Sequence, residues 1–162
     1  MRVVVEESRV VIETEARGLL AAAAHDLRIE APIASGEADD ARCTARFEVA
    51  AMRVAESRRH GTDAWRTPDE RDARDIERRI RDEAFPGLRE IVVEGQSASV
   101  TVRAARTQTV TAAVTIERGE KTVVRGRCAL SLAALGVGKI HVPLGAIKLD
   151  DRVEVSFDVV LA

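Results

Sequence analysis

The side chains best suited to proton transfer or metal binding are three histidines that lie far apart in the sequence. His25 precedes Asp26 at the start of an alternating segment, His60 lies in a charged connection, and His141 lies between two apolar residues. Zinc sites bring their ligands together at short helical or hairpin spacings, which these histidines lack. We therefore expect no metal site, with His25 bonded to backbone at a strand end, His60 solvated and His141 at a sheet edge.

Acidic pairs and one glycine-rich turn are the other candidates for chemistry. Asp39-Asp40 and Asp150-Asp151 stand at strand ends, where aspartate commonly shapes turns. Gly136-Val137-Gly138-Lys139 lacks the upstream glycine and the following Ser or Thr of a phosphate-binding loop. No nucleophile, base and orienting group come together in the sequence. We predict no enzyme, no catalytic residue and no cofactor.

The two cysteines, Cys43 and Cys128, have neither CxxC spacing nor a neighbouring histidine. Both occur within apolar alternation. We expect them to pack as small hydrophobic side chains.

Length and charge narrow the class of protein. The chain has 162 residues, which fits a single domain over 1–162. Its 25 basic and 27 acidic residues are mixed and give a net charge of −2, too weak a field to attract nucleic acid. No apolar run approaches the roughly 20 residues that span a bilayer, and Glu6 and Glu7 interrupt any secretory signal. These features predict a cytoplasmic protein.

Alternation with period two is the strongest structural signal. A strand with one face on a core and one in water alternates in this way, and seven segments of the chain do so. The predicted inner residues are Val10, Ile12, Thr14 and Ala16; Leu27, Ile29, Ala31 and Ile33; Cys43, Ala45, Phe47 and Val49; Ala98, Val100, Val102 and Ala104; Val110, Ala112, Val114 and Ile116; Val124, Gly126, Cys128, Leu130 and Leu132; and Val153, Val155, Phe157, Val159 and Leu161.

Two interruptions of this pattern are informative. The parity changes at Ala50–Ala51, which predicts a bulge or a strand end. One helix is predicted over Pro68–Ala84, with Thr67 as its N-cap and Phe85-Pro86-Gly87 as its stop. This helix is a candidate lid or plug.

The number of strands and the scarcity of helices favour a closed or nearly closed antiparallel sheet of eight to nine strands. Only three Phe and one Trp are present, and Tyr is absent. The interior must therefore be filled by small side chains. Eight strands can enclose one small ligand, and small inner residues favour such a cavity.

Several segments resemble the YceI-like family, which is described as polyisoprenoid-binding. They are Ser8-Arg9-Val10-Val11-Ile12, His25-Asp26-Leu27, Asp82-Glu83-Ala84-Phe85-Pro86 and the stretch from Gly145 to Asp158. The resemblance covers nearly the whole chain. It implies an all-β fold with one main helix, an antiparallel eight-stranded lipocalin-like β-barrel, holding an isoprenoid or fatty-acid derivative along its axis.

Two functions are compatible with these features. The first is non-enzymatic carriage of a long apolar chain, with His25 near a polar head group. The second is a structural or interaction module with a filled core, which dimerises or docks on a partner through an outer face. The outward residues of that face include Val11, Val92, Val123 and Val160. A cavity of a few hundred Å³ would favour the carrier. The residues predicted to bind the chain are His25, Leu27, Ile29, Phe47, Val49, Val100, Val102, Val114, Ile116, Leu130, Val155 and Phe157.

Overall fold

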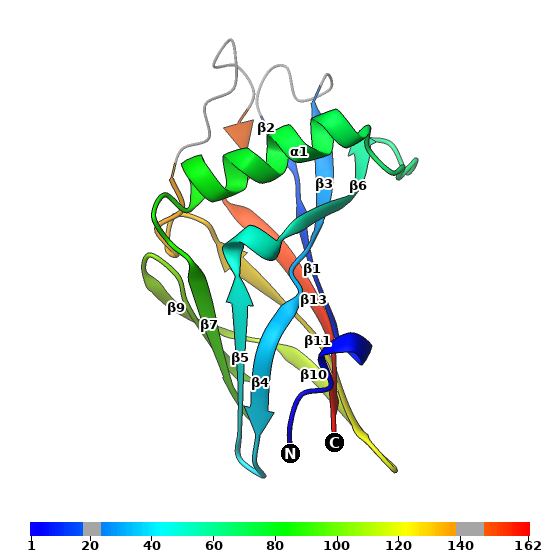
Figure 1. Ribbon diagram of the computed structural model, residues 1–162, viewed down its shortest axis with the longest axis vertical. Coiled ribbons are helices and arrows are strands. Elements are labelled where there is room, and N and C mark those ends of the chain that lie inside the picture. The colour runs from blue at the N-terminus through cyan, green and yellow to red at the C-terminus, as the bar shows by residue number, and fades with distance from the viewer. Residues whose placement is uncertain (18–23, 139–147) are drawn as a thin grey trace.

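Thirteen strands and one α-helix are present in the computed structural model, which describes residues 1–17, 24–138 and 148–162 (Figure 1). The strands are β1 (Arg9–Thr14), β2 (Ala16–Arg17), β3 (His25–Glu30), β4 (Ile33–Ala38), β5 (Arg42–Glu48), β6 (Arg53–Arg59), β7 (Glu90–Gln96), β8 (Ser99–Arg103), β9 (Thr107–Thr111), β10 (Ala113–Arg118), β11 (Thr122–Ser131), β12 (Lys148–Leu149) and β13 (Arg152–Leu161). The helical segments are η1 (Val5–Glu7), η3 (Val49–Ala51), α1 (Glu70–Arg79) and η4 (Ile80–Ala84).

The strands form two large antiparallel sheets and one small one. The six-stranded sheet has the order β10-β11-β13-β1-β3-β6, and the five-stranded sheet has the order β4-β5-β7-β8-β9. The remaining pair is β2 with β12. Every pairing between these strands is antiparallel, as the alternation predicted.

Sharp corners carry the chain from one sheet to the other. β3 leads into β4 through Ala31 and Pro32, and proline cannot donate the hydrogen bond that would continue a ladder. β5 leads into β6 through the 3-10 turn η3, so the parity change predicted at Ala50–Ala51 is confirmed as a strand end. β9 leads into β10 at Ala112. At these corners the chain passes directly from one sheet to the other, and the two sheets face each other.

The first residues of the chain bridge the two sheets along one side. Val3 N donates to Gly36 O at 3.0 Å, in β4, and Val4 N donates to Val160 O at 2.8 Å, in β13. Gly36 makes this approach possible, since a Cβ there would lie 2.5 Å from Val3 Cγ2. The N-terminal segment thus covers a seam between the sheets.

The predicted eight-stranded closed barrel is wrong in two respects. The described residues contain thirteen strands rather than eight, and neither large sheet closes on itself. The corners explain the difference, because they divide segments that alternate continuously in sequence. The segment from Val110 to Ile116, for example, is split at Ala112 between the two sheets. The mostly β composition and the single main helix are confirmed.

The helix begins two residues later than predicted. Asp69, not Thr67, is the N-cap, and its Oδ1 accepts a hydrogen bond from Arg71 N at 2.9 Å. After Arg79 the helix widens into the π-helical turn η4, which ends before Phe85. Figure 1 shows α1 lying across one end of the sheets, while both termini lie at the other end. No helix in the described ranges is long and apolar enough to cross a membrane.

Candidate binding cavity

A cavity of about 1920 Å³ lies between the two large sheets. At the α1 end its wall includes Ile76, Ile80 and Phe85, and at the opposite end it includes Met1 and Asp40. Pockets for drug-sized ligands usually measure about 300–1,000 Å³. This cavity therefore has room for a ligand considerably larger than that.

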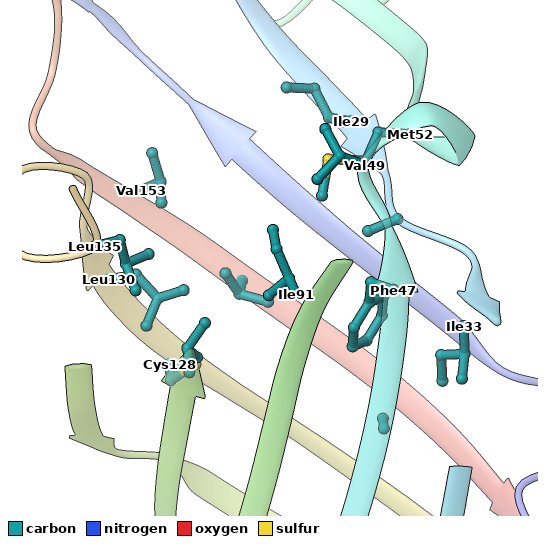
Figure 2. Close-up of a cluster of buried hydrophobic side chains, with 14 of the residues drawn as sticks. Ile29, Ile33, Phe47, Val49, Met52, Ile91, Cys128, Leu130, Leu135 and Val153 are labelled. Atoms are coloured by element: carbon teal, nitrogen blue, oxygen red, sulfur yellow. The ribbon is translucent and has the colours of Figure 1, made fainter. Parts of the chain in front are cut away.

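Alternation along each strand determines which side chains line the cavity. On β1, Val10, Ile12 and Thr14 face the cavity, whereas Val11 and Glu13 do not. The same rule applies on the other strands, because successive side chains point to opposite faces of a sheet. Figure 2 shows members of the buried cluster, among them Phe47 and Ile91 from the five-stranded sheet and Leu130 and Val153 from the six-stranded sheet.

All of the residues predicted to bind a ligand lie on this wall except Val49. Val49 is 2% exposed and packs in the core at η3, where the chain turns between the sheets. His25 lies on the wall and is exposed. Ile116 lies on the wall near the opposite end and is 53% exposed. The wall residues from the prediction are His25, Leu27, Ile29, Phe47, Val100, Val102, Val114, Ile116, Leu130, Val155 and Phe157.

Polar groups on the wall gather at its two ends. At the α1 end they are Thr14, His25, Arg79 and Asp151. Asp151 accepts hydrogen bonds from Ser131 Oγ and Ala133 N. Thr14 is only 4% exposed, and its Oγ1 has no hydrogen-bond partner within the described part of the chain. The polar groups of the other end are Asp39, Asp40, Arg42, Gln96, Ser97, Arg118 and Thr122.

Both cysteines lie on the cavity wall as free thiols. Burial raises the pKa of the Cys43 thiol above its usual value. Burial also raises the pKa of Cys128, with a smaller contribution from the negative charge of Glu154. Both side chains are therefore protonated at neutral pH and behave as the small hydrophobic residues that the sequence predicted.

A buried ionic cluster lies on the outer face of the six-stranded sheet. Asp26 is 0% exposed and accepts hydrogen bonds from Ala16 N at 3.0 Å and from Arg58 Nε at 3.0 Å. Its Oδ1 also lies 2.8 Å from His60 Nδ1. Burial alone would raise the pKa of Asp26, but these hydrogen bonds outweigh it and the pKa is lowered.

The prediction of a solvated His60 is wrong, because its side chain is 33% exposed and bonded to Asp26. Trp65 covers the neighbouring part of the same face. Its ring centroid lies 4.0 Å from Arg28 Cζ and 4.5 Å from Arg58 Cζ, which is cation–π geometry. The cluster joins β2, β3, β6 and the connection that follows β6. We assign it a structural role.

No group of three or more potential metal ligands occurs in residues 1–17, 24–138 and 148–162. His141, which was predicted to lie at a sheet edge, falls outside the described residues.

Comparison with protein-family models and with curated proteins gives no significant match. Solved structures do match. A polyisoprenoid-binding domain from Saccharophagus degradans, implicated in plant cell wall breakdown, aligns with a TM-score of 0.63 and 11% identity over 98% of this chain and 95% of that chain. BcnA from Burkholderia cenocepacia aligns with a TM-score of 0.52 and 13% identity over 99% of both chains. Both are YceI-like proteins. The resemblance seen in the sequence is thus confirmed at the level of the fold.

Proposed function

We propose that this protein binds a long apolar chain, an isoprenoid or a fatty-acid derivative, in the cavity between its sheets and carries it without changing it chemically. The observation that carries this proposal is the continuous apolar wall around about 1920 Å³. The polyisoprenoid-binding description of a structure with the same fold supports an apolar ligand.

The energetics favour a ligand of considerable length. Each buried methylene contributes about 0.8 kcal/mol, so ten carbons contribute roughly 8 kcal/mol. Association costs about 4–15 kcal/mol in lost freedom, so that ten carbons alone give weak binding. The size of the cavity permits a longer chain, and no strong ionic contact is then needed.

The first experiment measures what the purified protein holds. Native mass spectrometry and solvent extraction should reveal bound apolar chains, either retained from the host or taken up from phosphatidylcholine vesicles that contain hexadecan-1-ol. A protein that neither retains nor accepts an apolar chain would refute the proposal.

A matched pair of variants locates the binding site. Val93 and Val92 are neighbours on β7 and both are half-buried, but only Val93 lies on the cavity wall. Val93→Glu should reduce the bound chain several-fold, because it places a charge on the apolar wall that the chain would cover. Val92→Glu adds the same group to the outer face and should retain binding. Equal loss in both variants would argue against the cavity.

The interaction module remains a second candidate because of one feature. β10 is at the edge of its sheet and carries the exposed Ile116, and an unpaired edge strand can bind another strand. Of the outward valines predicted to form a dimer surface, however, Val160 is buried. Sedimentation at several protein concentrations tests this candidate, and a monomer at all concentrations would exclude the homodimer.

A further inference from the structure

We infer that Thr14 is the hydrogen-bonding residue for an uncharged, oxygen-bearing head group of the bound chain, such as an alcohol or a carbonyl. This head group would then lie at the α1 end of the cavity. The inference rests on the proposed function and adds the orientation of the ligand and the class of its head group.

The position of Thr14 is fixed by two strand pairings. It is the last residue of β1 and lies opposite Leu27 of β3, which in turn lies opposite Ser57 of β6. Figure 1 shows this end of β1 at the same end of the molecule as α1. Alternation along β1 places the Thr14 side chain on the same face as Val10 and Ile12, which is the cavity face.

The hydroxyl of Thr14 is buried and has no hydrogen-bond partner among residues 1–17, 24–138 and 148–162. A buried hydroxyl left without a hydrogen bond costs about 1–3 kcal/mol. In the described part of the chain, Thr14 Oγ1 is the buried side-chain oxygen or nitrogen found without a partner. Valine has nearly the same shape and no such cost. A polar atom brought against this part of the wall by a ligand would supply the missing partner.

The neighbours of Thr14 favour a head group without charge. Its neighbours on the wall are Ile12 and Ala16, two positions away along the chain, and Leu27, its partner on β3, and their side chains offer no hydrogen bond. Burying an ion among such groups is far more costly than burying a neutral hydroxyl. Arg79, which lies on the wall at this end, donates to Asp75 at 2.9 Å, and Glu83 lies 4.0 Å away. Its charge is thus balanced within the helix.

A competition experiment tests the inference. Wild-type protein and the Thr14→Val variant are equilibrated with phosphatidylcholine vesicles that contain equal amounts of hexadecan-1-ol and hexadecane. The chains bound to the protein are then extracted and quantified. The ratio of bound alcohol to bound hydrocarbon should fall about three- to tenfold in Thr14→Val, the effect of one neutral hydrogen bond. Thr14→Ser keeps the hydroxyl and should restore the ratio.

Two further measurements separate this role from a structural one. Thr14→Val should unfold at the same temperature as the wild type or a higher one, since it removes an unsatisfied hydroxyl. Thr122→Val makes the same chemical change at the opposite end of the cavity and should not lower the ratio. An unchanged ratio in Thr14→Val, or a fall in Thr122→Val instead, would overturn the inference.

The total amount of chain bound distinguishes the two proposals. If the wild type binds neither hexadecan-1-ol nor hexadecane, the proposed function fails. If it binds both and the ratio does not depend on Thr14, only the head-group assignment fails. A second competition uses vesicles that contain equal amounts of hexadecanoate and hexadecan-1-ol. A bound ratio of hexadecanoate to hexadecan-1-ol that exceeds the ratio in these vesicles would refute the uncharged head group.

Discussion

Asp26 shows what one buried charge contributes to this fold. Its pKa is lowered in the folded protein, so its stabilising contribution is present above its unfolded value, 3.8, and is lost as the pH falls through the folded value. Asp26→Asn should lower the free energy of unfolding at pH 7 by about 2–4 kcal/mol, because Arg58 loses its buried partner. Urea unfolding at pH 7 and at pH 3 measures both effects, and the difference from wild type should shrink at pH 3.

Asp63 provides the control for this substitution. It also lies near Arg58, with Asp63 Oδ1 at 3.9 Å from Arg58 Nη1, but its side chain is fully exposed. Asp63→Asn should leave the urea midpoint almost unchanged, since exposed ion pairs contribute little. Equal effects of the two substitutions would contradict the structural role assigned to Asp26.

Cys43 offers a direct reporter of cavity occupancy. Its thiol lies on the wall and is half-buried, so a bound chain should shield it from N-ethylmaleimide. In a Cys128→Ala background, labelling followed by intact mass should be several-fold slower after loading with hexadecan-1-ol. Because burial raises the pKa of Cys43 above 9.0, the labelling rate should still be rising at pH 9. Identical rates with and without the alcohol would place the ligand elsewhere.

Local alternation made the cavity wall predictable, residue by residue. Facing direction depends only on position along a strand, and therefore Leu27, Val102 and Phe157 could be assigned to one face from the sequence. The bond between Asp26 and His60 could not be predicted in this way. The two residues are 34 positions apart, and they meet because β3 and β6 pair in a register that no local pattern reveals.

At the scale of elements, the seam between β4 and the N-terminal segment depends on Gly36. Gly36→Ala should lower the free energy of unfolding by about 1–3 kcal/mol, because its Cβ would lie 2.5 Å from Val3 Cγ2 and 2.9 Å from Thr44 O. Gly95→Ala is the matched control on β7, where the nearest atom to a Cβ is Cys43 O at 4.0 Å. It should be neutral or stabilise the protein by up to about 1 kcal/mol. Thermal or urea unfolding distinguishes the two, and similar values for both would contradict the tight seam.

The sequence predicted the individual strands and the helix better than it predicted whether the sheets close into a barrel. Strands, the break at Ala50–Ala51 and the single helix followed from local signals. The helix start was predicted too early because Thr67 with Glu70 fits a capping box, whereas Asp69 caps equally well two residues on. Closure into a barrel depends on hydrogen bonding at the corners, where Pro32 has no N–H to donate and Ala112 N donates to Ala98 O. Local sequence patterns do not show which strands pair at these corners.

At the scale of the whole molecule, a filled cavity should stabilise the fold. A ligand present at a hundred times its dissociation constant adds about 2.7 kcal/mol, which corresponds to a rise in Tm of roughly 5–10 °C for a domain of this size. Circular dichroism melts of protein loaded with hexadecan-1-ol and of unloaded protein measure this shift. Val93→Glu, which places a charge on the apolar wall, should show a much smaller rise. A large rise in Val93→Glu would indicate binding outside the cavity.

The two ends of the chain lie side by side at the end of the molecule opposite α1 (Figure 1). Arg2 N donates to Ala162 O at 2.7 Å, and Ala162 N donates to Arg2 O at 3.0 Å. A short glycine-serine linker could therefore join them without disturbing either sheet. New ends fit at Gly61, which has a positive φ of 79° and open space around it. Circular permutation would therefore move the chain ends to Gly61, which follows β6. A fused partner would then be attached at Gly61 rather than at the end of the molecule that holds the present termini.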